Sequence, residues 1–219
     1  MKPNKAQLPH RHAFKVAELI VIVFAVIMLL VLFFTGVPRI RKEARLKQCS
    51  NNLKQIGLAF RIWSGDGGDR FQMQTPTLYD GSMESVTNGA VYHTFQVMSN
   101  ELGEPKYLVC PADDRRAVTN FPDLSNSAIS YFVNVDALDT EPLSFLTGDR
   151  NLTNGPLSST RLLSISTNST LVWSETLHHF IGNICFADGS VQTRTTPELK
   201  QAVTNMLNGT YPVYRLAFP

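Results

Sequence analysis

The chain has 219 residues, a formal net charge of +2 and three cysteines. Once an apolar N-terminal segment is set aside, about 155–180 residues remain, enough for one domain to bury a core without disulfides or metal ions. The charge is uneven, because residues 36–61 hold seven basic residues and one acidic residue, whereas residues 62–219 hold nine basic and sixteen acidic ones. A basic stalk that carries an acidic head argues against nucleic-acid binding.

The first predicted element is a membrane span. The most apolar stretch of the chain covers residues 13–35, and between Val16 and Phe34 its single charge is Glu18. This length matches the ~20 residues that an α-helix needs to cross the ~30 Å hydrocarbon core of a bilayer. A secretory signal peptide fits less well, because its apolar core is shorter and ends in a small-x-small cleavage site. We therefore expect a single-pass anchor.

A second helical stretch follows the span. Gly36 and Pro38 are expected to kink or loosen the helix. The stretch after them is basic, with apolar residues at steps of mostly three and four, which predicts an amphipathic stalk helix to about Trp63. The sequence GDGGD at 65–69 is expected to end it. The predicted organisation is a basic leader 1–13, a transmembrane helix 14–35, a stalk helix 36–64 and a soluble head 65–219.

The head has the pattern of an α+β domain. Helices are predicted at 91–102 and at 196–207, the second with a capping threonine and a proline in its first turn. Residues rich in β-branched and aromatic side chains predict short strands at 107–109, 129–135, 170–174, 183–186 and 191–195. Asp188 and Gly189 predict a tight hairpin turn between the last two strands. Residues 112–128 and 136–160 are expected to be long loops.

Cys49, Cys110 and Cys185 leave two alternatives open. An odd number argues against a pure disulfide framework, but an extracytoplasmic head permits one bridge, for which Cys49–Cys110 is our preferred pair. The alternative is three buried thiols that act as small hydrophobic side chains. No C-x-x-C pair or zinc-type spacing occurs in the sequence.

Several motifs carry a resemblance to a known family. HAFKVAELIVIVFAV resembles the prepilin signal of type IV pilins and type II secretion pseudopilins, in which a peptidase cuts before a Phe and methylates the new amine. The cut implied here lies between Ala13 and Phe14, and Glu18 is then the fifth mature residue. Later blocks resemble a large bacterial group of pilin-like proteins: KQCSNNLKQIGLAFRIWSGD (47–66), CPAD, SYFVN, GDRN and HHFIGNICFADGSV (178–191). The last block fits that group's His-x9-Asp-Gly signature with His178, Asp188 and Gly189.

The resemblance implies a fold, partners and a location. The expected fold is pilin-like α+β, in which a long N-terminal helix packs on a small antiparallel sheet. The implied role is a structural or minor subunit of a filament, and the implied partners are a prepilin peptidase, like subunits and membrane lipid. The resemblance also implies the bacterial inner membrane with the head outside the cytoplasm, although the basic flank after the span would by itself favour the opposite orientation.

Two residues depart from the family pattern and support an alternative. Ala13 stands where the family usually has Gly, and Lys15 stands where it usually has a small polar residue. The alternative is an unprocessed single-pass envelope protein whose head binds a ligand or a partner.

We expect no enzyme activity and no cofactor. His178, His179 and Asp188 could form a metal or acid–base site. The predicted turn already explains why an Asp stands at 188, and a His at the start of the preceding strand can simply hydrogen-bond a loop backbone. No G-x-S-x-G, P-loop or G-x-G-x-x-G motif occurs in the sequence. Calcium is a weaker possibility, because loop carboxylates are the ligands it prefers. The carboxylates considered are those of Asp66, Asp69, Asp149 and Asp188.

Overall fold

The computed structural model describes residues 16–154 and 159–219. The expected leader, with Ala13 and Phe14, lies outside the described residues. The chain divides into two compact units, residues 1–41 and residues 42–219, which are described separately below.

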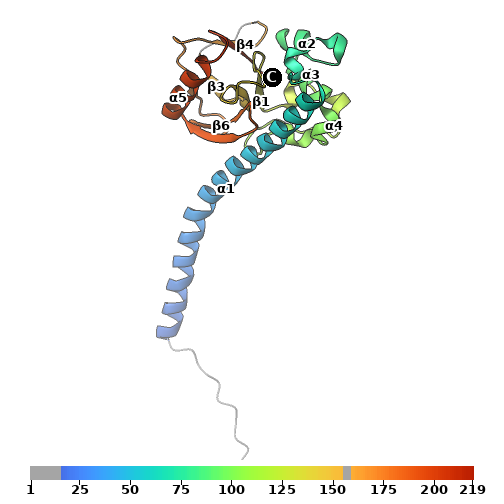
Figure 1. Ribbon diagram of the computed structural model, residues 1–219. Coiled ribbons are helices and arrows are strands. Elements are labelled where there is room, and N and C mark those ends of the chain that lie inside the picture. The colour runs from blue at the N-terminus through green and yellow to red at the C-terminus, as the bar shows by residue number, and fades with distance from the viewer. Residues whose placement is uncertain (1–15, 155–158) are drawn as a thin grey trace, which may run out of the picture. The chain divides into compact units, whose positions relative to one another are not determined.

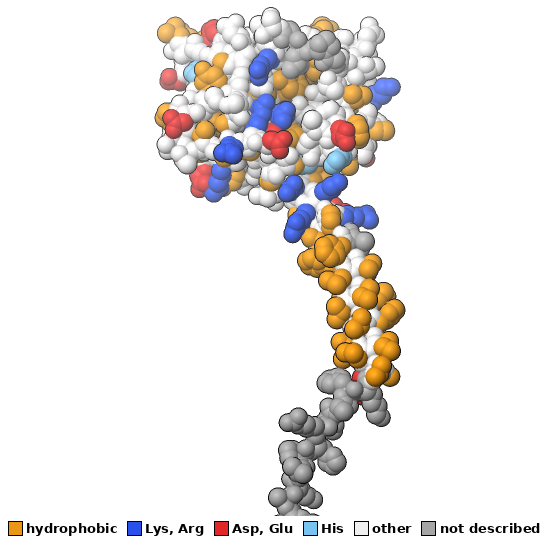
Figure 2. Space-filling view, turned by 180° about the vertical axis from the view of Figure 1, so that it is seen from behind, with side chains coloured by type: hydrophobic (Ala, Val, Ile, Leu, Met, Phe, Trp, Pro, Cys, Tyr) orange, Lys and Arg blue, Asp and Glu red, His pale blue; other side chains and the backbone are white. Residues whose placement is uncertain are grey.

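The described part of the first unit belongs to α1 (Val16–Asp66), a helix of 51 residues that extends into the second unit. Its side chains from Val16 to Phe34 are exposed, and Figure 2 shows hydrophobic side chains on this part of the helix. By length and composition the helix contains one candidate membrane span. The helix continues through Pro38, so the residue predicted to kink or loosen the helix does not end it. A proline removes one helical hydrogen bond and can leave a bend rather than an end.

The second part of α1 supplies one wall of the core in the second unit. Cys49, Leu53, Ile56 and Phe60 are completely buried along one face, as the spacing of apolar residues predicted. Gly57 lies on the same stretch, where α1 comes very close to Cys185 and Gly189. A Cβ added to Gly57 would lie 2.5 Å from the Cys185 Sγ atom, so the helix packs here at a distance that only glycine permits.

The second unit is built on an antiparallel sheet of six strands in the order β4-β8-β1-β2-β6-β7. Its strands are β1 (Tyr131–Asn134), β2 (Phe145–Asp149), β4 (Leu162–Ile165), β6 (Ile181–Phe186), β7 (Val191–Thr195) and β8 (Tyr214–Ala217). A second, two-stranded sheet pairs β3 (Leu152–Thr153) with β5 (Val172–Trp173). The α+β class is confirmed, and the predicted loop 136–160 is partly wrong because it contains β2 and β3.

The helices that follow α1 in the second unit are short except for the last. They are α2 (Met83–Thr87), α3 (Val91–Val97), α4 (Ser99–Leu102) and α5 (Thr196–Leu207), with 3-10 turns η1 (Gln72–Gln74), η2 (Thr77–Tyr79), η3 (Pro105–Leu108), η4 (Phe121–Asp123) and η5 (Asn126–Ala128). The helix predicted at 91–102 is divided at Met98, and the strand predicted at 107–109 is wrong because η3 occupies most of it. The predicted α5 is confirmed.

The six-stranded sheet separates two hydrophobic clusters. One contains the buried face of α1 together with Tyr131 and Val133, and the other contains Phe132 with the buried side chains of α5. Neighbouring residues of β1 thus point to opposite faces, as the two-residue period of a strand requires. Figure 1 shows α5 and helices α2–α4 on opposite sides of the sheet. Because both faces of β1 and β2 are covered, polar side chains on these strands are enclosed by protein.

Candidate functional site

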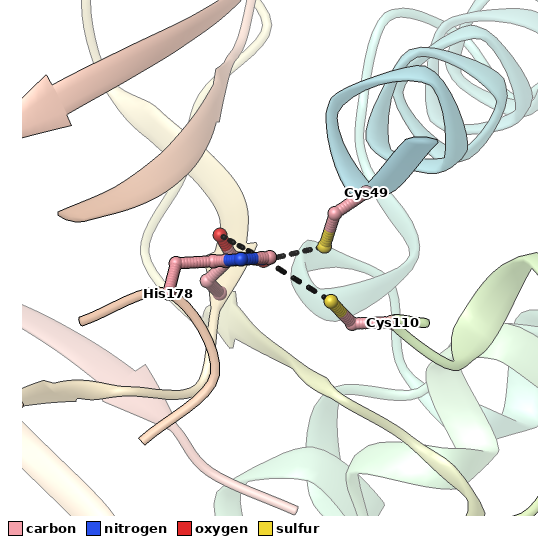
Figure 3. Close-up of side chains that lie close together, drawn as sticks. Cys49, Cys110 and His178 are labelled. Atoms are coloured by element: carbon pink, nitrogen blue, oxygen red, sulfur yellow. Dashed lines mark hydrogen bonds and ion pairs between the residues drawn. The ribbon is translucent and has the colours of Figure 1, made fainter. Parts of the chain in front are cut away.

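Four residues that can bind metal ions meet in the interior of the second unit. They are Cys49, Cys110, Asp149 and His178, all buried, and one potential ligand atom from each lies within 4.8 Å of all the others. The Cys110 Sγ atom is 3.2 Å from His178 Nε2, and the Cys49 thiol donates to Asp149 Oδ1 at 3.0 Å. His178 Nε2 lies 3.7 Å from Asp149 Oδ2. Figure 3 shows the labelled Cys49, Cys110 and His178 side chains pointing toward one another.

The two cysteines are held close by the contact between α1 and the segment after η3. Asn52, one turn along α1 from Cys49, donates its side-chain amide to the Val109 carbonyl at 3.1 Å. The next residue, Cys110, donates its backbone N–H to Ser130 Oγ at 3.0 Å. The Ala112 N–H donates to Cys110 Sγ at 3.5 Å, a contact that favours a thiolate at this position. These hydrogen bonds hold the segments that carry both thiols in place without a bound ligand.

Asp149 enters the cluster from the end of β2. It is fully buried, and its Oδ2 atom accepts two hydrogen bonds from Asn183 on β6, from the backbone N–H at 2.7 Å and from Nδ2 at 2.9 Å. Asn183 itself is fixed, because Thr193 on β7 donates to its Oδ1 atom at 2.7 Å. Asp149 Oδ2 is therefore occupied by hydrogen bonds from β6, whereas Oδ1 accepts from the Cys49 thiol.

His178 comes from the loop between β5 and β6, and this loop is strained. Leu177, His179 and Phe180 all have positive φ values, of 66°, 51° and 64°. Positive φ is unfavourable for residues with a Cβ, and a bulky residue there is an outlier. Strain of this kind costs of order 1–3 kcal/mol per residue and is concentrated at functional sites. The strained loop keeps the His178 ring buried beside Cys110.

The buried groups change one another's affinity for protons. Burial raises the pKa of Cys49, and Cys110 and Asp149 raise it further. The Cys49 thiol lowers the pKa of Cys110 to about 6 against the effect of burial, and His178 adds to the lowering. Burial also raises the pKa of Asp149. For His178, burial lowers the pKa, but Cys110 and Asp149 outweigh burial and the net shift is upward. Cys110 is thus the thiol that ionises first, beside an imidazole whose pKa is raised.

The geometry is not that of a cysteine-hydrolase triad. In such a triad the nucleophile contacts one ring nitrogen of the histidine and the carboxylate orients the other. Here Cys110 and Asp149 both contact His178 Nε2. The four side chains converge instead on a common point, and two thiols, an imidazole and a carboxylate are a donor set that holds a transition-metal ion.

The predicted disulfide is not formed. Cys49, Cys110 and Cys185 are free and buried, so the alternative of three buried thiols describes their state in the structure. The preferred pair, Cys49 and Cys110, is nevertheless brought together, since both thiols belong to the cluster with His178 and Asp149. Cys185 stands apart and points its Sγ toward the Phe186 carbonyl at 3.6 Å.

The signature residues separate in the structure. Asp188 and Gly189 form the predicted turn of the β6–β7 hairpin: Gly189 has φ of 83° and Asp188 Oδ1 accepts from the Ser190 N–H at 2.8 Å. Asp188 is exposed, whereas His178 is buried and has Asp149 as its carboxylate partner. The suggested hydrogen bond from His178 to a loop backbone is therefore replaced by contacts to side chains.

The carboxylates considered for calcium do not gather. Asp66 and Asp69 are exposed near the C-terminal end of α1, and Asp149 lies in β2 rather than on a loop. Glu18, considered for processing and assembly, is exposed in the first turn of α1, and Ala13 and Phe14 lie outside the described residues.

Comparisons with family models, with curated proteins and with solved structures find no match for this chain.

Proposed function

We propose that this protein is a membrane-anchored structural or minor subunit of a pilin-like filament, similar to type II secretion pseudopilins. The observation that supports this role is α1, one helix that is exposed and apolar over Val16–Phe34 and then buries one face, with Cys49, Leu53 and Ile56, against an antiparallel sheet. A helix of this composition is stable in a bilayer and, after extraction, requires another apolar surface around it. Identical helices in a bundle provide that surface.

Glu18 has a specific part in this proposal. A carboxylate in a membrane segment costs roughly 2.5–3.5 kcal/mol on insertion scales and needs a partner. Cleavage before Phe14 creates an α-amine four residues away in the sequence, and in a helix bundle the amine of one subunit can pair with Glu18 of its neighbour. The pairing offsets the burial of both charges and fixes the axial register between subunits.

The basic residues that follow the span have a role before assembly. Arg39, Arg41, Lys42, Arg45 and Lys47 are exposed on α1, and Figure 2 shows Lys and Arg side chains gathered after the hydrophobic part of the helix. Basic side chains beside a span bind anionic lipid headgroups, at about 1 kcal/mol each. In this proposal they hold the subunit at the inner membrane, with the head outside the cytoplasm, until a prepilin peptidase has acted.

The test compares two acid-to-alanine variants of the same helix. Glu18→Ala should remain folded and membrane-bound but fail to co-purify with sheared filaments, whereas Glu43→Ala, outside the apolar segment, should assemble like the wild type. Full incorporation of Glu18→Ala would refute the register role.

A second candidate function rests on Ala13 and Lys15, the two departures from the prepilin pattern. It is an unprocessed envelope protein whose head binds a ligand or partner. Intact mass and N-terminal sequencing of protein from native membranes separate the two functions. A chain that begins at N-methylated Phe14 supports the filament subunit, and a chain that retains its leader supports the envelope protein.

A further inference from the structure

We propose that Cys49, Cys110, Asp149 and His178 bind one Zn²⁺ ion, and that this ion fastens the α1 helix to the sheet. The ligands are the two Sγ atoms, His178 Nε2 and Asp149 Oδ1. The proposal concerns how the head is held together, and it does not depend on whether the protein assembles into a filament.

The four side chains are already close to the spacing of a tetrahedral site. Bonds of ≈ 2.3 Å to sulfur and ≈ 2.0–2.2 Å to nitrogen or oxygen give ligand–ligand edges of about 3.4–3.8 Å. Two edges between the proposed ligand atoms are 3.2 Å, from Cys110 Sγ to His178 Nε2, and 3.0 Å, from Cys49 Sγ to Asp149 Oδ1, and the ligand atoms of the four residues all lie within 4.8 Å of one another. Since these separations lie within about 1 Å of the edges of a tetrahedral site, an ion can enter through small side-chain shifts.

The groups around the ligands already orient them. The Tyr131 hydroxyl lies 3.2 Å from Cys49 Sγ, and the Ala112 N–H donates to Cys110 Sγ. The two bonds from Asn183 occupy Asp149 Oδ2 and leave Oδ1 for the metal. Such outer hydrogen bonds fix the direction of the ligands at metal sites and tune their charge. Their presence around all three anionic ligands distinguishes this cluster from a chance meeting of buried residues.

Burial and ligand type select the ion. Cys49, Cys110 and Asp149 have no exposed surface and His178 is 9% exposed, so the site is closed to solvent in the manner of a structural site. Two thiolates and an imidazole favour Zn²⁺ over Ca²⁺ and Mg²⁺, which take oxygen ligands. Binding displaces the protons of both thiols and any proton on His178 Nε2. The two thiolates balance the two positive charges of the ion, and with the Asp149 carboxylate the site carries a net charge of −1.

The ligands come from four separate segments. Cys49 lies on α1, Cys110 follows η3, Asp149 ends β2 and His178 lies in the strained loop before β6. A fully buried carboxylate is costly without a cation beside it, and the ion offsets this cost while it ties the four segments together. It also explains why the His178 loop is retained with three residues at positive φ.

The first test uses the full-length wild-type protein, purified in detergent without chelators. We expect about one zinc per chain by elemental analysis. Removal of zinc by a chelator should lower the unfolding temperature, and added Zn²⁺ should restore it. Co²⁺ added to the zinc-free protein should give the intense visible and near-ultraviolet bands of a tetrahedral thiolate site. A protein that holds no zinc after equilibration with Zn²⁺, and gives no such bands with Co²⁺, would overturn the proposal.

A pair of variants tests which thiols bind the ion. Cys110→Ala should lose zinc and the Co²⁺ bands, whereas Cys185→Ala removes an equally buried thiol outside the cluster and should keep both. Equal zinc content in the two variants would refute the assignment. If Cys110→Ala does not fold, the Co²⁺ spectrum of the wild type still decides whether the protein has a tetrahedral thiolate site.

Thiol counting excludes a competing state. The denatured, chelator-treated wild type should titrate three thiols per chain, matching the three cysteines of the sequence. A single thiol would mean that Cys49 and Cys110 form a disulfide in the isolated protein, and the zinc site would be refuted.

Discussion

Gly57 offers a sharp test of how closely α1 packs on the β6–β7 hairpin. A Cβ at this position would lie 2.5 Å from Cys185 Sγ, far inside van der Waals contact, and its next neighbours are the Cα and O atoms of Gly189, each at 3.6 Å. Cys185 is completely buried, so its side chain can move away only by displacing other packed atoms. Gly57→Ala therefore creates a single clash with a single identifiable atom.

The magnitude follows from two opposing effects. Overpacking a buried contact costs typically 1–3 kcal/mol, and so severe an overlap belongs in the upper part of that range. Replacing Gly by Ala in a helix interior returns about 1 kcal/mol. We expect Gly57→Ala to destabilise the head by about 1–2 kcal/mol, which at about 2–4 °C per kcal/mol lowers the unfolding temperature by several degrees.

The decisive measurement is a double-mutant cycle between Gly57→Ala and Cys185→Ala. Without the sulfur, the added methyl group meets only atoms at 3.6 Å, which is ordinary contact. In the Cys185→Ala background, Gly57→Ala should thus be neutral or stabilising by up to about 1 kcal/mol. Unfolding can be followed in detergent by tryptophan fluorescence, because Trp63 and Trp173 both lie after the apolar segment. An effect of Gly57→Ala that is the same in both backgrounds would refute the proposed contact.

Two further predictions concern the edges of the head. Thr195→Ala should cost about 1 kcal/mol of stability in thermal unfolding, because Thr195 caps α5 and its N–H and hydroxyl both donate to Glu198. The control is Thr204→Ala on the same helix, which should cost much less because the Thr204 hydroxyl only donates to the Lys200 carbonyl within the helix. Glu141 tests pH dependence: burial raises its pKa, but hydrogen bonds from Thr210 and Tyr214 outweigh burial and lower it. A lowered folded-state pKa gives stability that is present above the unfolded value and is lost as the pH falls through the folded value. Glu141→Gln should therefore flatten the decline in stability below about pH 4, and parallel curves for wild type and variant would contradict this.

The sequence was informative where one element determines its own structure. The apolar run and the apolar residues at steps of three and four after it define α1, and Asp188-Gly189 and Thr196-Pro197-Glu198 define a hairpin and a helix start by local chemistry. The capping residue of that helix is Thr195 rather than the predicted Thr196. Strands β2, β3, β4 and β8 were missed. Phe145–Asp149 is buried at every position and so lacks the alternation that identifies a half-exposed strand. The partners of β8 are distant in the sequence, because it pairs with β4 and, 80 residues or more away, with β1.

The buried cluster could not be predicted because its spacing is not local. Cys49, Cys110, Asp149 and His178 come from four segments, whereas sequence patterns for metal sites rely on ligands a few residues apart. Each residue was visible in a motif, but Asp149 appeared as a loop acid and His178 was paired with Asp188. Only the antiparallel pairing of β2 with β6 brings Asp149 beside Asn183 and next to the His178 loop.

The place of β8 has a consequence for how the protein is made. Residues 214–217 lie between β4 and β1, so the strand closest to the C-terminal end of the sequence is interior to the sheet. During synthesis, β1 and β4 emerge first and have no shared neighbour until β8 arrives. The exposed edges of unpaired strands invite wrong pairing, and distant pairings form slowly. In the proposed membrane-anchored subunit, the sheet would therefore remain incomplete beside the membrane until β8 is made, and its unpaired edges would be open to chaperones and proteases during that interval.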